Sequence, residues 1–257
     1  MLNREQAIAV FDSGLGGLSV LRALRRLLPN ERFVYYGDSA NAPYGSRSAE
    51  EVRELTLRAF SMLSEAHDCK AFVVACNTAT SAAISTLRAR FSDLPVIGIE
   101  PALKPAVDRH PNGRVVVMAT ETTLHEEKFA RLMQACTGRC EIVPLPCPGL
   151  MEFVERGELD SPALNARLRS LLAPHPTPDA VVLGCTHYPF LRPALRQVLP
   201  ETTEILDGSD GTARETRRRL AALDLLRENE EGELILLNSS DDPALRTLAQ
   251  HLLDLPD

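Results

Sequence analysis

The stretch VVLGCTHYP, residues 181–189, decides the fold, because an apolar run typical of a buried strand leads directly into Cys185 and His187. An earlier stretch, FVVACNT at 72–78, has the same form, with Cys76 after its apolar run. In open parallel sheets, ligands bind outside the carboxyl ends of the strands. The two stretches therefore predict parallel strands that each carry a thiol at the functional edge of a sheet.

Such apolar runs alternate with stretches of helical periodicity along the whole chain, which predicts βαβ units and an α/β fold. We expect strands at 7–11, 32–37, 71–75, 95–99, 114–119, 141–145, 180–184, 203–206 and 234–238. We expect helices near 17–28, 48–66, 78–90, 122–135, 160–173, 190–198, 210–226 and 243–254.

A near-constant offset of 108 or 109 residues relates the two halves of this pattern. The matched positions are Asp12 with Thr120, Asp38 with Cys147, Cys76 with Cys185, and Ile97 with Ile205. We therefore expect two pseudo-symmetric parallel-sheet α/β domains that face each other across a central cleft. In that arrangement Cys76 and Cys185 lie on opposite walls of the cleft.

Composition narrows the class of protein. The chain has 257 residues, 44% apolar and 25% charged, as expected of a soluble globular protein. A net charge of −7 without a basic patch argues against a nucleic-acid partner. Because no signal pattern and no apolar run of about 18 residues is present, we expect no membrane partner and a cytoplasmic location. Cys136, Cys140 and Cys147 lack a second close ligand pair, so no metal site is predicted.

The chemistry of two opposed thiols follows from where they lie. Backbone N–H groups at a helix start favour a thiolate by about 0.3–1 kcal/mol, and by up to about 2 kcal/mol in favourable geometry, whereas forming the thiolate at pH 7 costs about 2 kcal/mol. A proton acceptor is therefore wanted beside each thiol: Asp12 for Cys76, and His187 for Cys185. The alternative roles are a capping or core histidine for His187, and a turn or N-cap residue for Asp12. Two bases on opposite faces of one carbon suit inversion of a stereocentre.

Such an inversion needs a stabilised carbanion, which pyridoxal phosphate would supply through a lysine Schiff base. None of the three lysines, Lys70, Lys104 and Lys128, lies in a suitable place, so no cofactor is predicted. The site must then rely on fixed hydrogen-bond donors near the strand ends. The candidates are Ser13, Tyr44, Gly45, Asn77, Thr78 and Thr186, for which turn formation and capping are the alternatives.

Four motifs together resemble the cofactor-independent aspartate/glutamate racemase family, and within it the branch that acts on glutamate. They are FDSGLGGLSVL (11–21), YYGDSANAPYGSRS (35–48), VVACNTATS (73–81) and VLGCTHYPFL (182–191). The resemblance implies interconversion of L- and D-glutamate for peptidoglycan synthesis, without a cofactor, by a protein that forms a homodimer. It also implies a first domain of residues 1–97 plus 208–257 and a second of residues 98–207.

The same resemblance assigns roles to single residues. It implies that Cys76 acts as the base on D-glutamate with help from Asp12, and that Cys185 acts as the base on L-glutamate with help from His187. It implies substrate binding by Asp12, Ser13, Tyr44, Gly45, Asn77, Thr78, Thr186 and His187. Glu155, in LMEFVERGE, falls where the family carries a glutamate near the histidine. Aspartate racemases usually have a glutamate at the position of His187, so this histidine favours glutamate as the substrate.

Three other functions compete with this interpretation. Gly14, Gly16 and the later Asp38 imitate a dinucleotide fingerprint, although Ser19 occupies its third glycine position. A racemase of aspartate or a related amino acid would share the motifs. A cleft that only captures an amino acid would share the fold, but it would have no need of two reactive thiols at equivalent strand ends.

Overall fold

The protein divides into two compact units. The computed structural model describes residues 2–125, 127–228 and 231–256. Residues 1–100 and 209–257 form unit 1, and residues 101–208 form unit 2. Every strand pairing in the described residues is parallel, so the predicted pair of parallel-sheet α/β domains is confirmed. In the described part of the chain, no helix is both long enough and apolar enough to cross a membrane.

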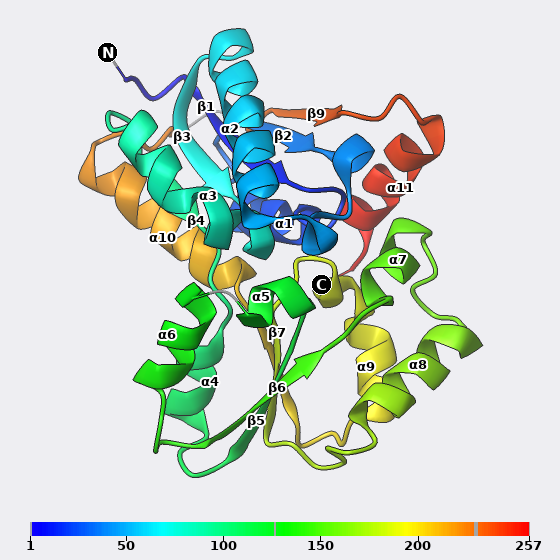
Figure 1. Ribbon diagram of the computed structural model, residues 1–257. Coiled ribbons are helices and arrows are strands. Elements are labelled where there is room, and N and C mark those ends of the chain that lie inside the picture. The colour runs from blue at the N-terminus through cyan, green and yellow to red at the C-terminus, as the bar shows by residue number, and fades with distance from the viewer. Residues whose placement is uncertain (1, 126, 229–230, 257) are drawn as a thin grey trace. The chain divides into compact units, whose positions relative to one another are not determined.

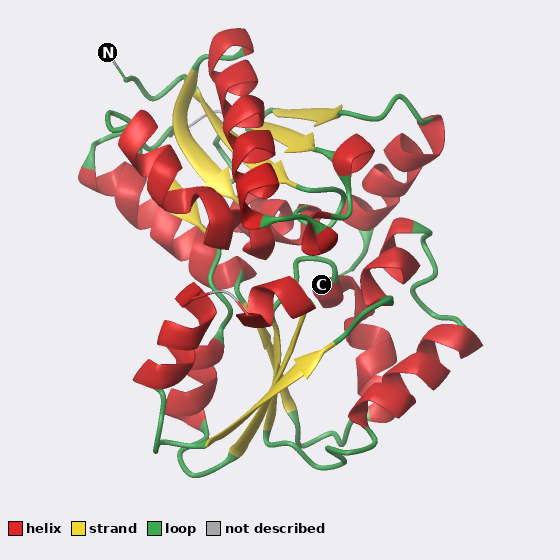
Figure 2. Cartoon of the chain, viewed as in Figure 1, coloured by secondary structure: helices red, strands yellow, loops and turns green. Residues whose placement is uncertain are grey.

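Unit 1 is built on a sheet with the strand order β4-β3-β1-β2-β9. Its strands are β1 (Ala7–Asp12), β2 (Phe33–Gly37), β3 (Cys69–Val74), β4 (Val96–Gly98) and β9 (Leu234–Asn238). The helices α2 (Ala49–Ala66) and α3 (Asn77–Arg90) pack together over one face. The helices α1 (Leu18–Leu27), α10 (Ser209–Ala222) and α11 (Pro243–Asp254) pack together on the other (Figures 1 and 2). Because both faces are covered, β1 and β3 are almost entirely buried and largely apolar, with Asp12 and Lys70 as their charged residues.

Unit 2 is built on a sheet with the order β6-β5-β7-β8. Its strands are β5 (Arg114–Ala119), β6 (Glu141–Pro146), β7 (Ala180–Leu183) and β8 (Glu204–Asp207). Helix α4 (Leu103–Arg109) precedes β5 in the chain. Helices α5 (Glu121–His125) and α6 (Glu127–Ala135) follow it. Later come α7 (Leu150–Glu155), α8 (Pro162–Leu172), the 3-10 helix η3 (Tyr188–Leu191) and α9 (Arg192–Val198).

The two sheets repeat one topology. The order β4-β3-β1-β2 in unit 1 recurs as β8-β7-β5-β6 in unit 2, so β7 occupies the place of β3. Cys185 after β7 therefore corresponds to Cys76 after β3, as the sequence offset predicts. Unit 1 differs by its additional strand β9, which pairs with β2 and comes from the far end of the chain.

Some helix predictions were wrong in detail. The sequence pattern missed α4 and α7, which are short, and the predicted helix at 122–135 is described as α5 and α6, with residue 126 outside the described residues. The predicted helix at 210–226 ends at Ala222. It ends there because Asp224 adopts a left-handed conformation with φ of 55°, and the Leu225 N–H turns back to the Leu220 carbonyl.

Gly17 lies at the start of α1, very close to the end of β1. A Cβ at Gly17 would lie 2.5 Å from the Asp12 Cβ and 3.0 Å from the Ala75 Cβ. We therefore expect Gly17→Ala to destabilise unit 1 by about 1–3 kcal/mol, measured as a lower urea midpoint. The matched control is Gly211→Ala in α10, where the added Cβ would meet no described atom within 4 Å apart from its chain neighbours and its own helix backbone. This control should unfold at an unchanged or higher midpoint, and an equal loss in both variants would contradict the packing argument.

Candidate functional site

The carboxyl edge of the unit 1 sheet brings together most of the predicted site residues. Asp12 ends β1, and the Ala75 N–H donates to the Phe11 carbonyl at 2.8 Å, which holds the end of β3 beside it. Asp12 is fully buried, and its Oδ2 accepts a hydrogen bond of 3.0 Å from the Gly14 N–H. A buried carboxylate thus lies next to the strand that leads to Cys76.

Cys76 is the N-cap residue of α3. The Ala79 N–H donates to its Sγ at 3.4 Å, and the thiol itself lies 3.5 Å from the Ser13 Oγ. Cys76 is buried, so the helix N–H groups act on the sulfur with little screening by solvent. This arrangement favours negative charge on the thiol.

The next two residues, Asn77 and Thr78, form the first turn of α3, and both are buried. The Asn77 Oδ1 is buried and accepts no hydrogen bond from any residue that the structure describes. A buried amide oxygen without a partner is costly to keep. It is suited to receive a donor from a small polar ligand at this edge of the sheet.

Tyr44 also lies in this group, beside Gly45 in the 3-10 helix η2 (Tyr44–Ser46). Its hydroxyl donates to the Asp38 Oδ2 at 2.7 Å, and Asn41 Nδ2 donates to the same carboxylate. Burial raises the pKa of Tyr44, and both the Asp38 hydrogen bond and the nearby Cys76 raise it further. Tyr44 is therefore a neutral, firmly held hydroxyl close to the thiol. Asp38, which the sequence suggested as a dinucleotide ligand and as the counterpart of Cys147, holds Tyr44 in place.

The carboxyl edge of the unit 2 sheet carries a hydrogen-bonded chain of three side chains. The Cys185 Sγ lies 3.6 Å from the His187 Nδ1, and the His187 Nε2 lies 2.6 Å from the Glu155 Oε1. Cys185 and His187 follow β7, as does the buried Thr186, whereas Glu155 is the last residue of α7. Two elements that are distant in sequence therefore meet at this thiol.

The charge of His187 is set by these partners. Burial alone would lower the pKa of His187, but its hydrogen bonds to Cys185 and Glu155 outweigh burial and raise this pKa well above the usual range. These partners therefore favour the protonated, positively charged ring. A positive imidazole next to Sγ stabilises a thiolate at Cys185, in the manner of other cysteine–histidine pairs.

Cys147 and Tyr188 complete this part of unit 2. The buried Tyr188 hydroxyl donates to the Cys147 carbonyl at 3.1 Å. Burial, with a smaller contribution from Cys185, raises the pKa of Cys147 to about 12. The Cys147 thiol is therefore protonated and unreactive, unlike a thiol that faces a cationic ring.

The two thiol environments are related but not identical. Thr120, which corresponds to Asp12, bonds to Thr123 through their side-chain oxygens at 2.8 Å. In unit 2 the carboxylate near the thiol comes from Glu155 instead. The sequence motif around Glu155 is looser and only suggested this role. Sequence reasoning missed Tyr188. The signal that could have pointed to Tyr188 is the sequence offset that pairs Asp38 with Cys147. Each of these two residues accepts a hydrogen bond from a tyrosine hydroxyl.

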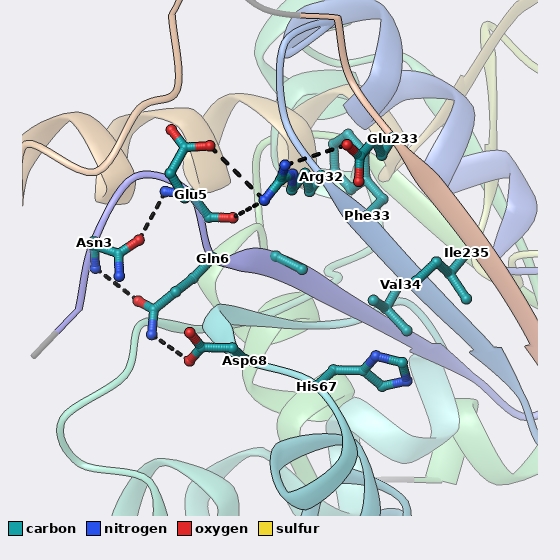
Figure 3. Close-up of a pocket in the computed structure, with 11 residues that line it drawn as sticks. Asn3, Glu5, Gln6, Arg32, Phe33, Val34, His67, Asp68, Glu233 and Ile235 are labelled. Atoms are coloured by element: carbon teal, nitrogen blue, oxygen red, sulfur yellow. Dashed lines mark hydrogen bonds and ion pairs between the residues drawn. The ribbon is translucent and has the colours of Figure 1, made fainter.

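Unit 1 also contains a hollow of about 280 Å³ near the amino ends of its strands (Figure 3). Its polar side chains pair with one another: Gln6 donates to Asp68 at 2.5 Å, and Arg32 donates to Glu233 at 3.3 Å. It is lined by Asn3, Glu5, Gln6, Ala7, Arg32, Phe33, Val34, His67, Asp68, Glu233 and Ile235. No thiol is among these residues, and the hollow lies at the opposite end of the strands from Cys76.

The fold and these two edges define an α/β protein with two units, each presenting a buried thiol where a parallel strand ends. The model of the Asp/Glu/Hydantoin racemase family matches residues 15–216, and the chain belongs to this family. The glutamate racemase of Clostridium perfringens is 46% identical over 251 residues, which make up 96% of each chain.

Solved structures agree with this membership. The glutamate racemase of Thermus thermophilus, in complex with β-chloro-D-alanine, has a TM-score of 0.82 at 37% identity and covers 97% of this chain and 94% of its own. The glutamate racemase of Escherichia coli, in complex with L-glutamate and the activator UDP-MurNAc-Ala, has a TM-score of 0.83 at 32% identity. It covers 96% of this chain and 92% of its own.

Proposed function

We propose that this protein is a cofactor-independent glutamate racemase that supplies D-glutamate for peptidoglycan synthesis. The observation that carries the proposal is the pair of buried thiols at equivalent strand ends, one capping a helix and one paired with a histidine. The relatives named above are glutamate racemases, and the Escherichia coli protein binds L-glutamate. A cytoplasmic location and a homodimer stay predictions.

The proposed reaction uses the two thiols in opposite protonation states. With L-glutamate bound, the Cys185 thiolate removes the α-proton, and the Cys76 thiol delivers its own proton to the other face of the carbon. The product is D-glutamate, and the protein is left with a Cys185 thiol and a Cys76 thiolate. Exchange of one proton with water restores the starting state, and the reaction in the other direction begins with Cys76. This scheme requires the two strand-end edges to face one cleft, as the sequence predicts.

Each side of the proposed site has a means of stabilising charge. The α3 N-terminus stabilises negative charge on Cys76, with Asp12 as the neighbouring proton acceptor, while His187, held by Glu155, acts at Cys185. The buried Asn77 Oδ1, which accepts no hydrogen bond from the described residues, is suited to accept one from the substrate ammonium. The hydroxyls of Ser13, Thr78 and Thr186, together with the backbone N–H groups of Tyr44 and Gly45, would bind the carboxylates, whose negative charge grows as the proton leaves.

The experiment is polarimetry of L-glutamate under reducing conditions with no added cofactor. We expect the rotation to decay to zero, and the rotation of D-glutamate to decay to zero from the opposite sign. Decay with aspartate but not with glutamate would instead identify an aspartate racemase. Binding of glutamate without exchange of its α-hydrogen for solvent deuterium would identify a binding module and refute the proposal.

A further inference from the structure

Tyr188 has a part in the unit 2 site that the two-thiol scheme does not use. We propose that Tyr188 is a positioning residue, whose hydroxyl fixes the turn at Cys147 and thereby holds α7 so that Glu155 reaches His187. The proposal deepens the proposed function, because the chain that Tyr188 would maintain serves the thiol Cys185.

The contacts of Tyr188 connect the two elements that meet at Cys185. Its backbone N–H donates to the Cys185 carbonyl at 3.1 Å, so the residue is tied to the end of β7. Its hydroxyl, on a side chain that is 1% exposed, donates to the Cys147 carbonyl at 3.1 Å. Cys147 in turn donates its N–H to the Ala119 carbonyl at 3.0 Å, at the end of β5. The Tyr188 hydroxyl therefore links β7 to the segment that leads into α7.

The helix α7 is short, so its position depends on its contacts with the rest of unit 2. It has six residues, and it begins after Gly149, whose φ of 87° is left-handed and whose position provides no side-chain cap. An isolated helix of this length is unstable in water, so its position depends on tertiary contacts. It packs against η3, the element that Tyr188 begins. A shift of α7 would separate Glu155 from His187.

Unit 1 has a related interaction, in which a tyrosine from a different loop bonds to the residue at the corresponding acceptor position. There the Tyr44 hydroxyl donates to Asp38, the residue that follows β2 as Cys147 follows β6. Each thiol is thus accompanied by a buried tyrosine that is tied to the end of a nearby strand. That a tyrosine bonds at this acceptor position beside both thiols supports a role for Tyr188 at the thiol site besides packing.

The test measures the titration of His187 directly. In Tyr188→Phe, where the ring stays but the hydroxyl is lost, we expect NMR to show a lower pKa of His187 than in the unaltered protein. The His187 signal is assigned from its loss in a His187→Gln variant. Glu155→Gln is the positive comparator and should lower this pKa further, because it removes the carboxylate itself. We also expect kcat/KM to fall about tenfold in Tyr188→Phe. In its pH profile, the limb that depends on His187 should move to lower pH.

The matched control is Tyr35→Phe in unit 1, which also loses a buried tyrosine hydrogen bond, of 2.7 Å to the Gly14 carbonyl. It should leave the His187 titration unchanged. An unchanged His187 titration in Tyr188→Phe as well would overturn the proposal and leave Tyr188 a packing role. Amide hydrogen exchange in Tyr188→Phe is a second measurement. The amides of α7 should exchange about tenfold faster relative to those of α8. Equal protection of both helices would also count against the proposal. Because neither readout needs turnover, failure of the proposed racemase activity would be recognised separately.

Discussion

Replacing either thiol with alanine is expected to abolish racemisation, lowering kcat/KM by at least about a thousandfold. The hydrogen exchange that survives should differ between the two variants. Cys185→Ala keeps the base that acts on D-glutamate, so D-glutamate should still exchange its α-hydrogen with deuterium oxide while L-glutamate does not. Cys76→Ala should show the reverse. The measurement is proton NMR of each enantiomer incubated with each variant.

A matched control for these variants is Cys147→Ala. Cys147 is also buried in unit 2, but its raised pKa keeps the thiol protonated, so its loss should leave both exchange reactions measurable. If both enantiomers exchanged equally in Cys185→Ala, one thiol would be serving both faces of the substrate. That result would contradict the two-base scheme while leaving the family membership untouched.

The largest effect on stability is expected from Lys70→Met. Lys70 is fully buried, its Nζ lies 2.6 Å from the Glu31 Oε2, and it donates to the carbonyls of Arg4 and Leu225 at 2.6 and 2.9 Å. Methionine fills a similar volume but leaves the Glu31 carboxylate buried without its cation. We expect unit 1 to lose about 3–5 kcal/mol of unfolding free energy, measured by urea denaturation.

The double variant Lys70→Met with Glu31→Gln separates charge from packing. It removes the buried carboxylate together with the cation, so it should recover a large part of the lost stability. A double variant as unstable as Lys70→Met alone would mean that the hydrogen bonds of Lys70 to the two carbonyls, and not its charge, hold this region together.

The positions of the thiols could be predicted because they depend on local pattern. Apolar runs mark each strand within two residues of its observed ends, and Cys76 and Cys185 follow such runs directly. The Glu155–His187 contact could not be predicted with the same assurance. It depends on α7, whose few residues are too short for a periodic signal and whose place is set by tertiary packing.

The buried polar network of unit 1 could not be predicted from the sequence pattern either. Lys70 lies at the amino end of a buried strand, and the pattern excluded it from cofactor chemistry without indicating its partner. The partner, Glu31, precedes β2, and its other oxygen accepts from the Arg227 N–H at 3.0 Å. Contacts between residues that lie 39 to 196 positions apart in the sequence leave no local signature. They are specified only when the sheet assembles.

The return of the chain to unit 1 has a consequence for how the protein forms during synthesis. Unit 2 is a continuous stretch, so all of its strands have been made before residue 209 is added. Unit 1 still lacks β9 at that point, along with Leu225 and Arg227, whose backbone groups satisfy Lys70 and Glu31. The half that is translated first is therefore the half that is completed last. Until then its β2 edge and its buried ion pair have no partners from the end of the chain.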